Sequence, residues 1–469
     1  MLRWLNSHVL VWLLVADVIS AHQFGCPQRI PGLTCQCHER SRGLDVLCEK
    51  SPIERVRSFL LRVAEQQDGV VYLKLNGNYL GSFPEDLLYG LDIKHLMVHE
   101  ANMSSIHRDA FQDLGDKLES LDLSKNHLTE VPTESLENLK KLVSLNLSLN
   151  QITIIRPEAF RGMRALIRLS LYGNRIHSMD PQAFKGVGIN LTRLNLGGNN
   201  LSKVPVEAFA LIEYLHSLEL HENNISVIET QTMPEALDKL NLADNQIRVV
   251  GPGSFRKISS LHLLDLSRNE ITEIHPDAFR NVSESMQWIK LGHNHLTEIP
   301  TVALRNMTGL RELDVRGNNI TRVEKDAFAT YNVNIRFLYL MKNQIEFLHP
   351  EALASLPRLE WLYMNQNRLR RLSREIFEPI VDTLIIIDVH GNPLDCDCDL
   401  SWFYKYATTI GKIVVSLPLE TKCETPQHLK GTPFKRIDLP CLNGDGARVV
   451  PREGNILVTL LVIALWSRW

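Results

Sequence analysis

The stretch LESLDLSKNHL, residues 118–128, returns in nearly the same form as LVSLNLSLNQI at residues 142–152. Both follow the pattern L-x-x-L-x-L-x-x-N-x-L, in which L is an aliphatic residue and x varies. The pattern occurs fourteen times, and from Asn126 onward its asparagines are 22 to 25 residues apart. A fixed period of this length is typical of a solenoid, because each repeat buries its apolar face only against its neighbours.

Thirteen of the fourteen repeats carry the asparagine, and the second carries Ala101 in its place, so we expect that coil to be looser. The step from Asn223 to Asn245 is the shortest, which predicts that the solenoid narrows there. The asparagines of the pattern are Asn78, Asn126, Asn150, Asn174, Asn199, Asn223, Asn245, Asn269, Asn294, Asn318, Asn343, Asn367 and Asn392.

Each position of the pattern has a physical role. The L-x-L segment predicts a short strand of a parallel sheet whose leucines face a shared core, and the asparagine is expected to bond the backbone of adjacent coils. Ten residues after the asparagine position, a large apolar side chain is expected to close each coil on its convex side. These side chains are Leu88, Phe111, Leu136, Phe160, Phe184, Phe209, Met233, Phe255, Phe279, Leu304, Phe328, Leu353 and Phe377.

The amino-terminal sequence is typical of a secretory signal peptide over residues 1–21. Arg3 precedes an apolar run from Val9 to Val15, and small residues follow at Ser20 and Ala21. The alternative is a buried amino-terminal helix. A signal peptide would send the chain into an oxidising compartment, where cysteines form disulfides.

The eight cysteines stand in two groups of four, with none between them. This arrangement predicts two small disulfide caps around a large body. Zinc sites are the alternative, although structural zinc sites usually have Cys-x-x-Cys or wider spacing. The groups are Cys26, Cys35, Cys37 and Cys48, and Cys396, Cys398, Cys423 and Cys441.

The repeats and the caps together resemble those of extracellular leucine-rich-repeat proteins. The resemblance implies an α/β-type leucine-rich-repeat solenoid, a curved horseshoe of about 14 repeats with a parallel sheet on its concave face and a disulfide-bonded cap at each end. In families with such caps the first cysteine pairs with the third and the second with the fourth. The pairs implied here are Cys26–Cys37, Cys35–Cys48, Cys396–Cys423 and Cys398–Cys441.

The carboxyl terminus ends in eleven apolar residues, from Ile456 to Trp466. As a helix this run would rise ~16 Å, about half of a bilayer core. Small residues and a polar spacer precede it, which is the signal for a glycosylphosphatidylinositol anchor attached at Asn443 or Gly444. The alternatives are secretion without an anchor and a short transmembrane helix. Caps, repeats and anchor signal together are similar to those of chaoptin, connectin and the Nogo receptors.

The expected organisation has five parts: a signal peptide at 1–21, an amino-terminal cap at 22–66, the repeats at 67–394, a carboxyl-terminal cap at 395–443 and a removed segment at 444–469.

No catalytic motif, phosphate-binding loop or metal motif occurs in the sequence, so we expect no enzyme activity, no cofactor and no metal. The net charge of −3 gives no sign of a nucleic-acid partner. Histidines such as His221 and His390 are expected to be solvated. Four arginines could bind a sulfated glycan or form the solvated edge of one coil. They are Arg368, Arg370, Arg371 and Arg374.

Eight glycosylation sequons lie in the repeats. Asn146 is the exceptional one, because it lies between two strand leucines and its glycan would block the early part of the concave face. The sequons are Asn102, Asn146, Asn190, Asn200, Asn224, Asn281, Asn306 and Asn319.

Aromatic residues gather at the variable concave positions of the tenth, twelfth and thirteenth repeats. An exposed aromatic cluster with a charged rim is the composition of a protein-binding hot spot. Early repeats have mainly small or polar residues at these positions. The alternative is that the stacked rings only stabilise the sheet. The aromatic residues are Trp288, Phe337, Tyr339, Trp361 and Tyr363, and Lys290, Asp314, Arg316 and Arg336 are expected at their rim.

The sequence therefore predicts a cell-surface recognition or adhesion protein, anchored by a lipid to the outer face of the plasma membrane and lacking a cytoplasmic domain. Its partner would be a protein ligand or an identical molecule on an apposed cell, and a transmembrane co-receptor would carry any signal. The alternative is a secreted structural or organising protein of the extracellular matrix.

Overall fold

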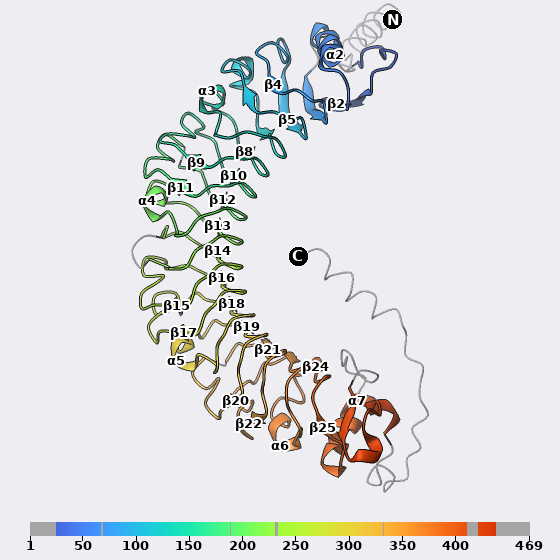
Figure 1. The fold of residues 1–469 in the computed structure, drawn as a ribbon, viewed down its shortest axis with the longest axis vertical. Helices are drawn as coiled ribbons and strands as arrows, with labels where there is room; N and C mark the ends of the chain where they lie inside the picture. Colours follow the sequence, from blue (N-terminus) through green and yellow to red (C-terminus); the bar gives the residue numbers. More distant parts are fainter. Residues whose placement is uncertain are drawn as a thin grey trace, which may run out of the picture.

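The computed structural model describes residues 25–66, 69–187, 189–229, 233–331, 333–409 and 421–437. These residues form an open arc with the long sheet on its inner, concave side and short helices and loops on its outer, convex side (Figure 1). The predicted signal peptide and the predicted lipid attachment residues, Asn443 and Gly444, lie outside the described residues. Within the described part of the chain, no helix has the length and apolar character needed to cross a bilayer.

Among the described residues, sixteen strands form the concave sheet. The first two, β1 (Cys35–Arg40) and β2 (Gly43–Glu49), make an antiparallel hairpin, and every later strand pairs in parallel with the one before it. These later strands number one per predicted repeat, which confirms the horseshoe of about 14 repeats. They are β3 (Val70–Asn76), β5 (Ile93–His99), β7 (Ser120–Asp122), β8 (Ser144–Asn146), β10 (Arg168–Ser170), β12 (Arg193–Asn195), β13 (Ser217–Glu219), β14 (Lys239–Asn241), β16 (Leu263–Asp265), β18 (Trp288–Lys290), β19 (Glu312–Asp314), β21 (Phe337–Tyr339), β23 (Trp361–Tyr363) and β24 (Ile386–Asp388).

The convex side holds short elements that the leucine pattern does not specify. In the described part of the chain, four helices have one turn each: α3 (Thr133–Leu136), α4 (Val206–Phe209), α5 (Thr301–Leu304) and α6 (Arg374–Phe377). Short strands pair in twos: β4 (Ser82–Phe83) with β6 (Ser105–Ile106), β9 (Ile154–Ile155) with β11 (Ser178–Met179), β15 (Val249–Val250) with β17 (Glu273–Ile274), and β20 (Arg322–Val323) with β22 (Phe347–Leu348). The 3₁₀ helices are Gln112–Leu114, Cys398–Leu400, Gln427–Leu429 and Phe434–Arg436.

The core lies between the sheet and these convex elements. All thirteen side chains predicted to close the coils are buried, which confirms that prediction. Neighbouring rings stack along the solenoid, as Phe160 does on Phe184 at 5.6 Å between ring centroids. Because each coil packs mainly against the coils beside it, this row of side chains joins them into one core.

The pattern asparagines form a buried hydrogen-bond ladder between coils. The Asn245 Nδ2 donates to the Leu220 carbonyl oxygen at 3.0 Å in the preceding coil and to the Leu242 carbonyl oxygen at 3.1 Å in its own. Its Oδ1 accepts the Ile225 backbone N–H at 2.9 Å. Leaving such buried backbone groups unpaired costs about 1–3 kcal/mol.

The expectation of a looser second coil was wrong. Ala101 is fully buried, and its carbonyl oxygen accepts the Leu80 N–H at 2.8 Å, in the place where other coils use an asparagine Oδ1. The Ala101 N–H in turn donates to the Asn126 Oδ1 at 3.1 Å. Strands β3 and β5 stay paired from Val70 opposite Ile93 onward. A backbone acceptor therefore takes the place of the missing asparagine Oδ1.

The short step before Asn245 does not narrow the sheet. Strands β13 and β14 keep their register, with Leu218 opposite Leu240, and the Asn245 bonds are complete. This repeat is two residues shorter than its neighbours, and the shortening lies on the convex side of the coil. Met233 occupies the position there that is a phenylalanine in most other repeats. A cavity lies there, as described below.

Both caps are held by disulfides. The amino-terminal cap combines the β1–β2 hairpin with α2 (Ile53–Glu65), and its bonds are Cys26–Cys37 and Cys35–Cys48, as predicted. The carboxyl-terminal cap contains β25 (Leu394–Asp395), α7 (Ser401–Thr409), β26 (Cys423–Thr425) and the predicted bond Cys396–Cys423. These six cysteines are therefore not zinc ligands. Cys441 lies outside the described residues, so its pairing with Cys398 stays a prediction.

Candidate functional site

The predicted aromatic residues lie on one continuous part of the concave sheet. Strands β18, β19, β21 and β23 are adjacent and in register. Their outward side chains form two columns that cross the strands. The Trp288 column is Trp288, Glu312, Phe337 and Trp361, and the Lys290 column is Lys290, Asp314, Tyr339 and Tyr363. We call these eight residues the late concave face.

The aromatic side chains pair as the strand spacing predicts. Phe337 and Trp361 meet edge to face, with ring centroids 4.8 Å apart, and Tyr339 and Tyr363 stack at 5.3 Å. Each of the four is half-buried, because each covers part of its neighbour. Burial raises the pKa of both tyrosines, so their hydroxyl groups stay protonated at neutral pH. The structure thus brings these four together, while Trp288 lies two strands away from Phe337.

Asp314 does not belong to the charged rim, which corrects that expectation. Its side chain is only 2% exposed, and its Oδ2 accepts the Arg316 Nε–H at 2.7 Å. Arg316 lies in turn over the Tyr339 ring, with 5.0 Å from its Cζ to the ring centroid. Asp314 therefore positions the arginine and does not itself face a partner.

The other two rim cations are also paired. Lys290 Nζ lies 3.6 Å from the Asp265 carboxylate on the preceding strand. Arg336 makes a bidentate contact with Glu360, with both N–O distances 2.8 Å. Sequence reasoning missed Glu360, because it precedes its strand and lies outside the alternation of the L-x-L segment.

Glu312 is the second residue that sequence reasoning missed. It is half-buried in the Trp288 column, and burial raises the pKa of its carboxyl group. The signal was present in the sequence, since Glu312 occupies the repeat position that Trp288, Phe337 and Trp361 occupy in other coils.

The early concave face has a different character. Asn146 is half-buried, and its Nδ2 donates to Asp122 Oδ2 at 3.0 Å, so a glycan on this nitrogen would compete with that contact. The other seven sequon asparagines are exposed.

The four arginines of the predicted glycan-binding stretch are exposed too, with Arg370 3.7 Å from Asp395 and Arg374 3.2 Å from Glu378.

Two of the histidines are less solvated than expected. The side chains of His221 and His390 are 23% and 18% exposed, and each lies beside an acidic residue. The His221 Nδ1 is 3.4 Å from Glu219, and this carboxylate raises the pKa of the imidazole.

Elsewhere on the surface, Glu85, His107 and Asp109 place possible ligand atoms within 4.8 Å of one another, an arrangement that carries no function by itself.

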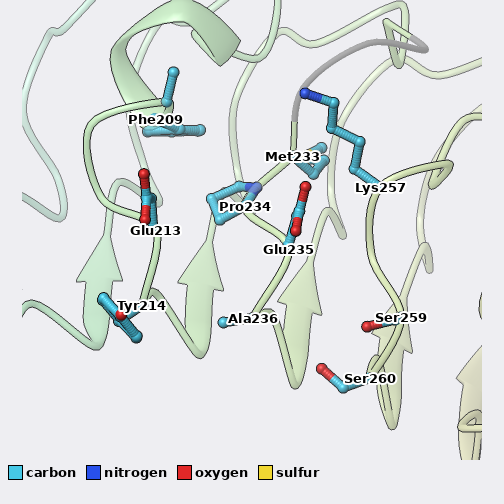
Figure 2. A pocket seen from close by; sticks show the side chains of 11 residues that line it. Phe209, Glu213, Tyr214, Met233, Pro234, Glu235, Ala236, Lys257, Ser259 and Ser260 are labelled. Atoms are coloured by element: carbon cyan, nitrogen blue, oxygen red, sulfur yellow. The ribbon is translucent and has the colours of Figure 1, made fainter.

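A cavity of about 590 Å³ opens at the short repeat, near the start of strands β13, β14 and β16. Figure 2 shows Phe209 and Met233 on one side of it and Tyr214, Ala236 and Ser260 on another. None of its lining residues belongs to the late concave face. The cavity lies at the repeat that is two residues shorter than the repeats on either side of it.

Comparison with known proteins agrees with this architecture. The profile described as "Leucine rich repeat" matches residues 116–176, 235–296, 284–332, 308–369 and 333–392, and a second profile of that repeat matches 190–211. The putative neurotrophin receptor LTRK 1 of Lymnaea stagnalis is 34% identical over 117 residues, which are 25% of this chain and 14% of the receptor. Leucine-rich repeat-containing protein 3 of Danio rerio is 36% identical over 128 residues, which are 27% of this chain and 44% of that protein. The chain thus spans less than half the length of either relative.

Solved structures share the fold. A chain of the TLR13–ssRNA13 complex has a TM-score of 0.61 at 21% identity over 80% of this chain and 60% of its own. A chain of the Drosophila Toll–Spatzle complex has a TM-score of 0.61 at 22% identity, and the match covers 80% of this chain and 52% of that one. A chain of the octameric complex of latrophilin 3, Unc5D and FLRT2 has a TM-score of 0.53 at 22% identity, and the match covers 78% of this chain and 94% of that one. At such identities the likeness shows the fold alone. Because the two repeat profiles match just over half of the sequence and the remaining coils continue the same ladder, the chain belongs to the leucine-rich-repeat proteins.

Proposed function

We propose that this protein is a cell-surface recognition or adhesion protein that binds a protein partner through its late concave face. The observation that carries the proposal is the row of half-exposed aromatic rings on a rigid sheet, with Arg316 and Arg336 at its edge. Large aromatic side chains and arginine are the residues that dominate the energy of protein interfaces. Because the rings already pack on one another, binding would require little ordering of side chains.

Two comparisons support a receptor or adhesion role. One relative is named a putative neurotrophin receptor, and one structural neighbour comes from a complex of latrophilin 3, Unc5D and FLRT2. The partner of this chain would be a protein ligand or an identical molecule on an apposed cell. A sulfated glycan at the Arg368–Arg374 stretch is a secondary candidate.

We place the protein on the outer face of the plasma membrane, held by a lipid at Asn443 or Gly444. The disulfides of both caps support an oxidising compartment. Phosphatidylinositol-specific phospholipase should release the protein from intact cells. Protein that stays on the cells, or that accumulates in the medium without treatment, would contradict the anchor and favour the matrix alternative.

A pair of double variants tests the binding face. Tyr339→Ala with Trp361→Ala should weaken binding of the purified protein to partner-bearing cells at least tenfold, since hot-spot truncations often cost more than about 2 kcal/mol. The matched control is Tyr72→Ala with His95→Ala. These two rings stack on the early strands of the same sheet, with their centroids 4.4 Å apart. The control should bind as the wild type does.

Secretion and melting temperature separate binding from stability. If the aromatic rings only stabilise the sheet, the Tyr339 and Trp361 double variant will secrete poorly or melt well below the control. If it folds and still binds, the site lies elsewhere on the solenoid.

A further inference from the structure

We infer that Glu312 is the anionic centre of the late concave face and that it accepts a basic side chain, arginine or lysine, from the protein partner. The inference rests on the proposed function and gives the partner a chemistry.

The strand register surrounds Glu312 with aromatic side chains. In the Trp288 column it lies directly between Trp288 on β18 and Phe337 on β21. Adjacent strands are about 4.8 Å apart, so both rings are within reach of a group bound to the carboxylate. Tyr339 stands on the same strand as Phe337, in the neighbouring column. A carboxylate between two aromatic residues is a suitable site for an organic cation, because ring faces attract positive charge.

The other acidic residues around the face already have partners within this chain. Asp265 lies 3.6 Å from Lys290, Glu360 binds Arg336, and Asp388 lies 2.8 Å from His390. Asp314 holds Arg316. These contacts neutralise the acids and the cations together.

Glu312 differs from all four. Within the described residues no hydrogen bond or ion pair at contact distance meets its carboxylate, although the side chain is half-buried and Lys290 and Arg316 attract it from farther away. Partial burial of a charge without a contact partner is unfavourable, and here the attraction of Lys290 and Arg316 offsets the lost water only in part. Its raised pKa has the same cause, because burial disfavours the charged form. A cation from the partner would supply the missing contact.

The face also contains a precedent for the contact between ring and cation. Arg316 lies over Tyr339 at 5.0 Å and Arg336 lies over Phe337 at 5.6 Å. Both arginines already have carboxylate partners, so an anionic ligand would have to displace an acid of this chain. The charge that remains without a partner is negative, and this favours a basic group over an acidic one.

Tryptophan emission offers a direct test on the full protein. The probe is the peptide acetyl-Gly-Arg-Gly-amide, and its control is the same peptide with citrulline, which keeps the shape of arginine and removes its charge. The arginine peptide should change the emission saturably, because Trp288 and Trp361 lie in the column of Glu312. The citrulline peptide should not.

Glu312→Gln should weaken binding of the arginine peptide at least tenfold, because it removes the charge and keeps the shape. The matched control is Glu219→Gln, which removes a carboxylate from the middle of the same sheet and should leave binding of the peptide unchanged. Equal binding of both peptides, or a Glu312→Gln variant that binds as the wild type does, overturns the inference.

Two further outcomes separate this inference from the proposed function. If the Tyr339 and Trp361 double variant loses binding to cells while Glu312→Gln keeps it, the proposal that the late concave face binds the partner is supported. The inference about Glu312 is then wrong. If a heparin fragment changes the emission saturably and the arginine peptide does not, the face binds anions and the inference is wrong.

Discussion

At the scale of single residues, asparagine at one repeat position does more than the leucines to fix the path of the chain. The leucines supply apolar burial, which has no direction, whereas each asparagine satisfies backbone groups of two coils at once. The residue before it takes a left-handed conformation, such as φ 54° at Asp244 and φ 56° at Leu149. The coils turn off the sheet at this pair of residues.

His221 makes the stability of the concave face depend on pH. The Glu219 carboxylate raises the pKa of His221 above 6.5, and His221 lowers the pKa of Glu219 below 4.5. The contribution of the histidine is complete below pH 6.5 and is lost as the pH rises through its raised value. That of the glutamate is complete above pH 4.5 and is lost as the pH falls. The pair therefore stabilises the fold most between these two values.

His221→Gln should accordingly lower the free energy of unfolding by about 0.5–1 kcal/mol at pH 5.5 and by less at pH 8.5, as for other partly exposed ion pairs. Urea titrations at the two pH values measure this difference. His177→Gln is the control, because His177 is exposed and has no acidic partner among the described residues. An equal loss at both pH values would show that the imidazole acts by packing alone.

At the scale of elements, the concave strands were predictable and the convex elements were not. The strands follow from alternation of leucines with variable residues, which is a local signal. The one-turn helices and paired short strands depend on how each coil packs against the next, for which the sequence has no comparable period. The Ala101 coil shows that one repeat position cannot be judged by itself, because a backbone carbonyl accepts the hydrogen bond that an asparagine Oδ1 accepts in other coils.

The carboxyl-terminal cap covers the apolar edge of the last coil. Trp402 Nε1 donates to the Leu372 carbonyl oxygen at 2.7 Å, its ring lies 5.4 Å from Phe377, and Phe403 is fully buried. The Cys396–Cys423 bond ties β25 to β26 beneath this layer.

Changing Cys396 and Cys423 to serine together should therefore expose the last coil and cause retention or aggregation of the protein, since loss of a disulfide from a small secreted domain costs about 2–5 kcal/mol. Secreted yield and the oligomeric state of the product measure the effect. Glu424→Gln, which alters only an exposed ion pair with Lys430, is the control. Normal yield of monomeric protein from the serine variant would contradict the role given to the cap.

At the scale of the whole molecule, the arc presents two different concave surfaces. Asn146 and Asn195 lie on strands of the earlier coils, with one stacked pair, Tyr72 and His95, near the start of the sheet, and two pairs of aromatic rings lie together on the late coils. The sequence predicted every residue of the late concave face except Glu312, because strand register follows from the repeat. It did not predict that Asp314 is buried or that Glu312 lacks a partner, since both facts depend on which long side chain reaches which acid.

The most direct test of the central claim places a glycan beside the late concave face. Asp265→Asn creates a sequon with Ser267 on β16, one strand before Trp288, and Asp122→Asn creates the same sequon with Ser124 on β7. The two changes are chemically identical and occupy the same repeat position. Adding Ser267→Ala to Asp265→Asn removes the sequon and controls for the lost charge. Of these three variants, only glycosylated Asp265→Asn should bind partner-bearing cells at least tenfold more weakly than the wild type does. Mass spectrometry confirms that its glycan is present. Binding equal to that of the wild type by this glycosylated variant would contradict the account.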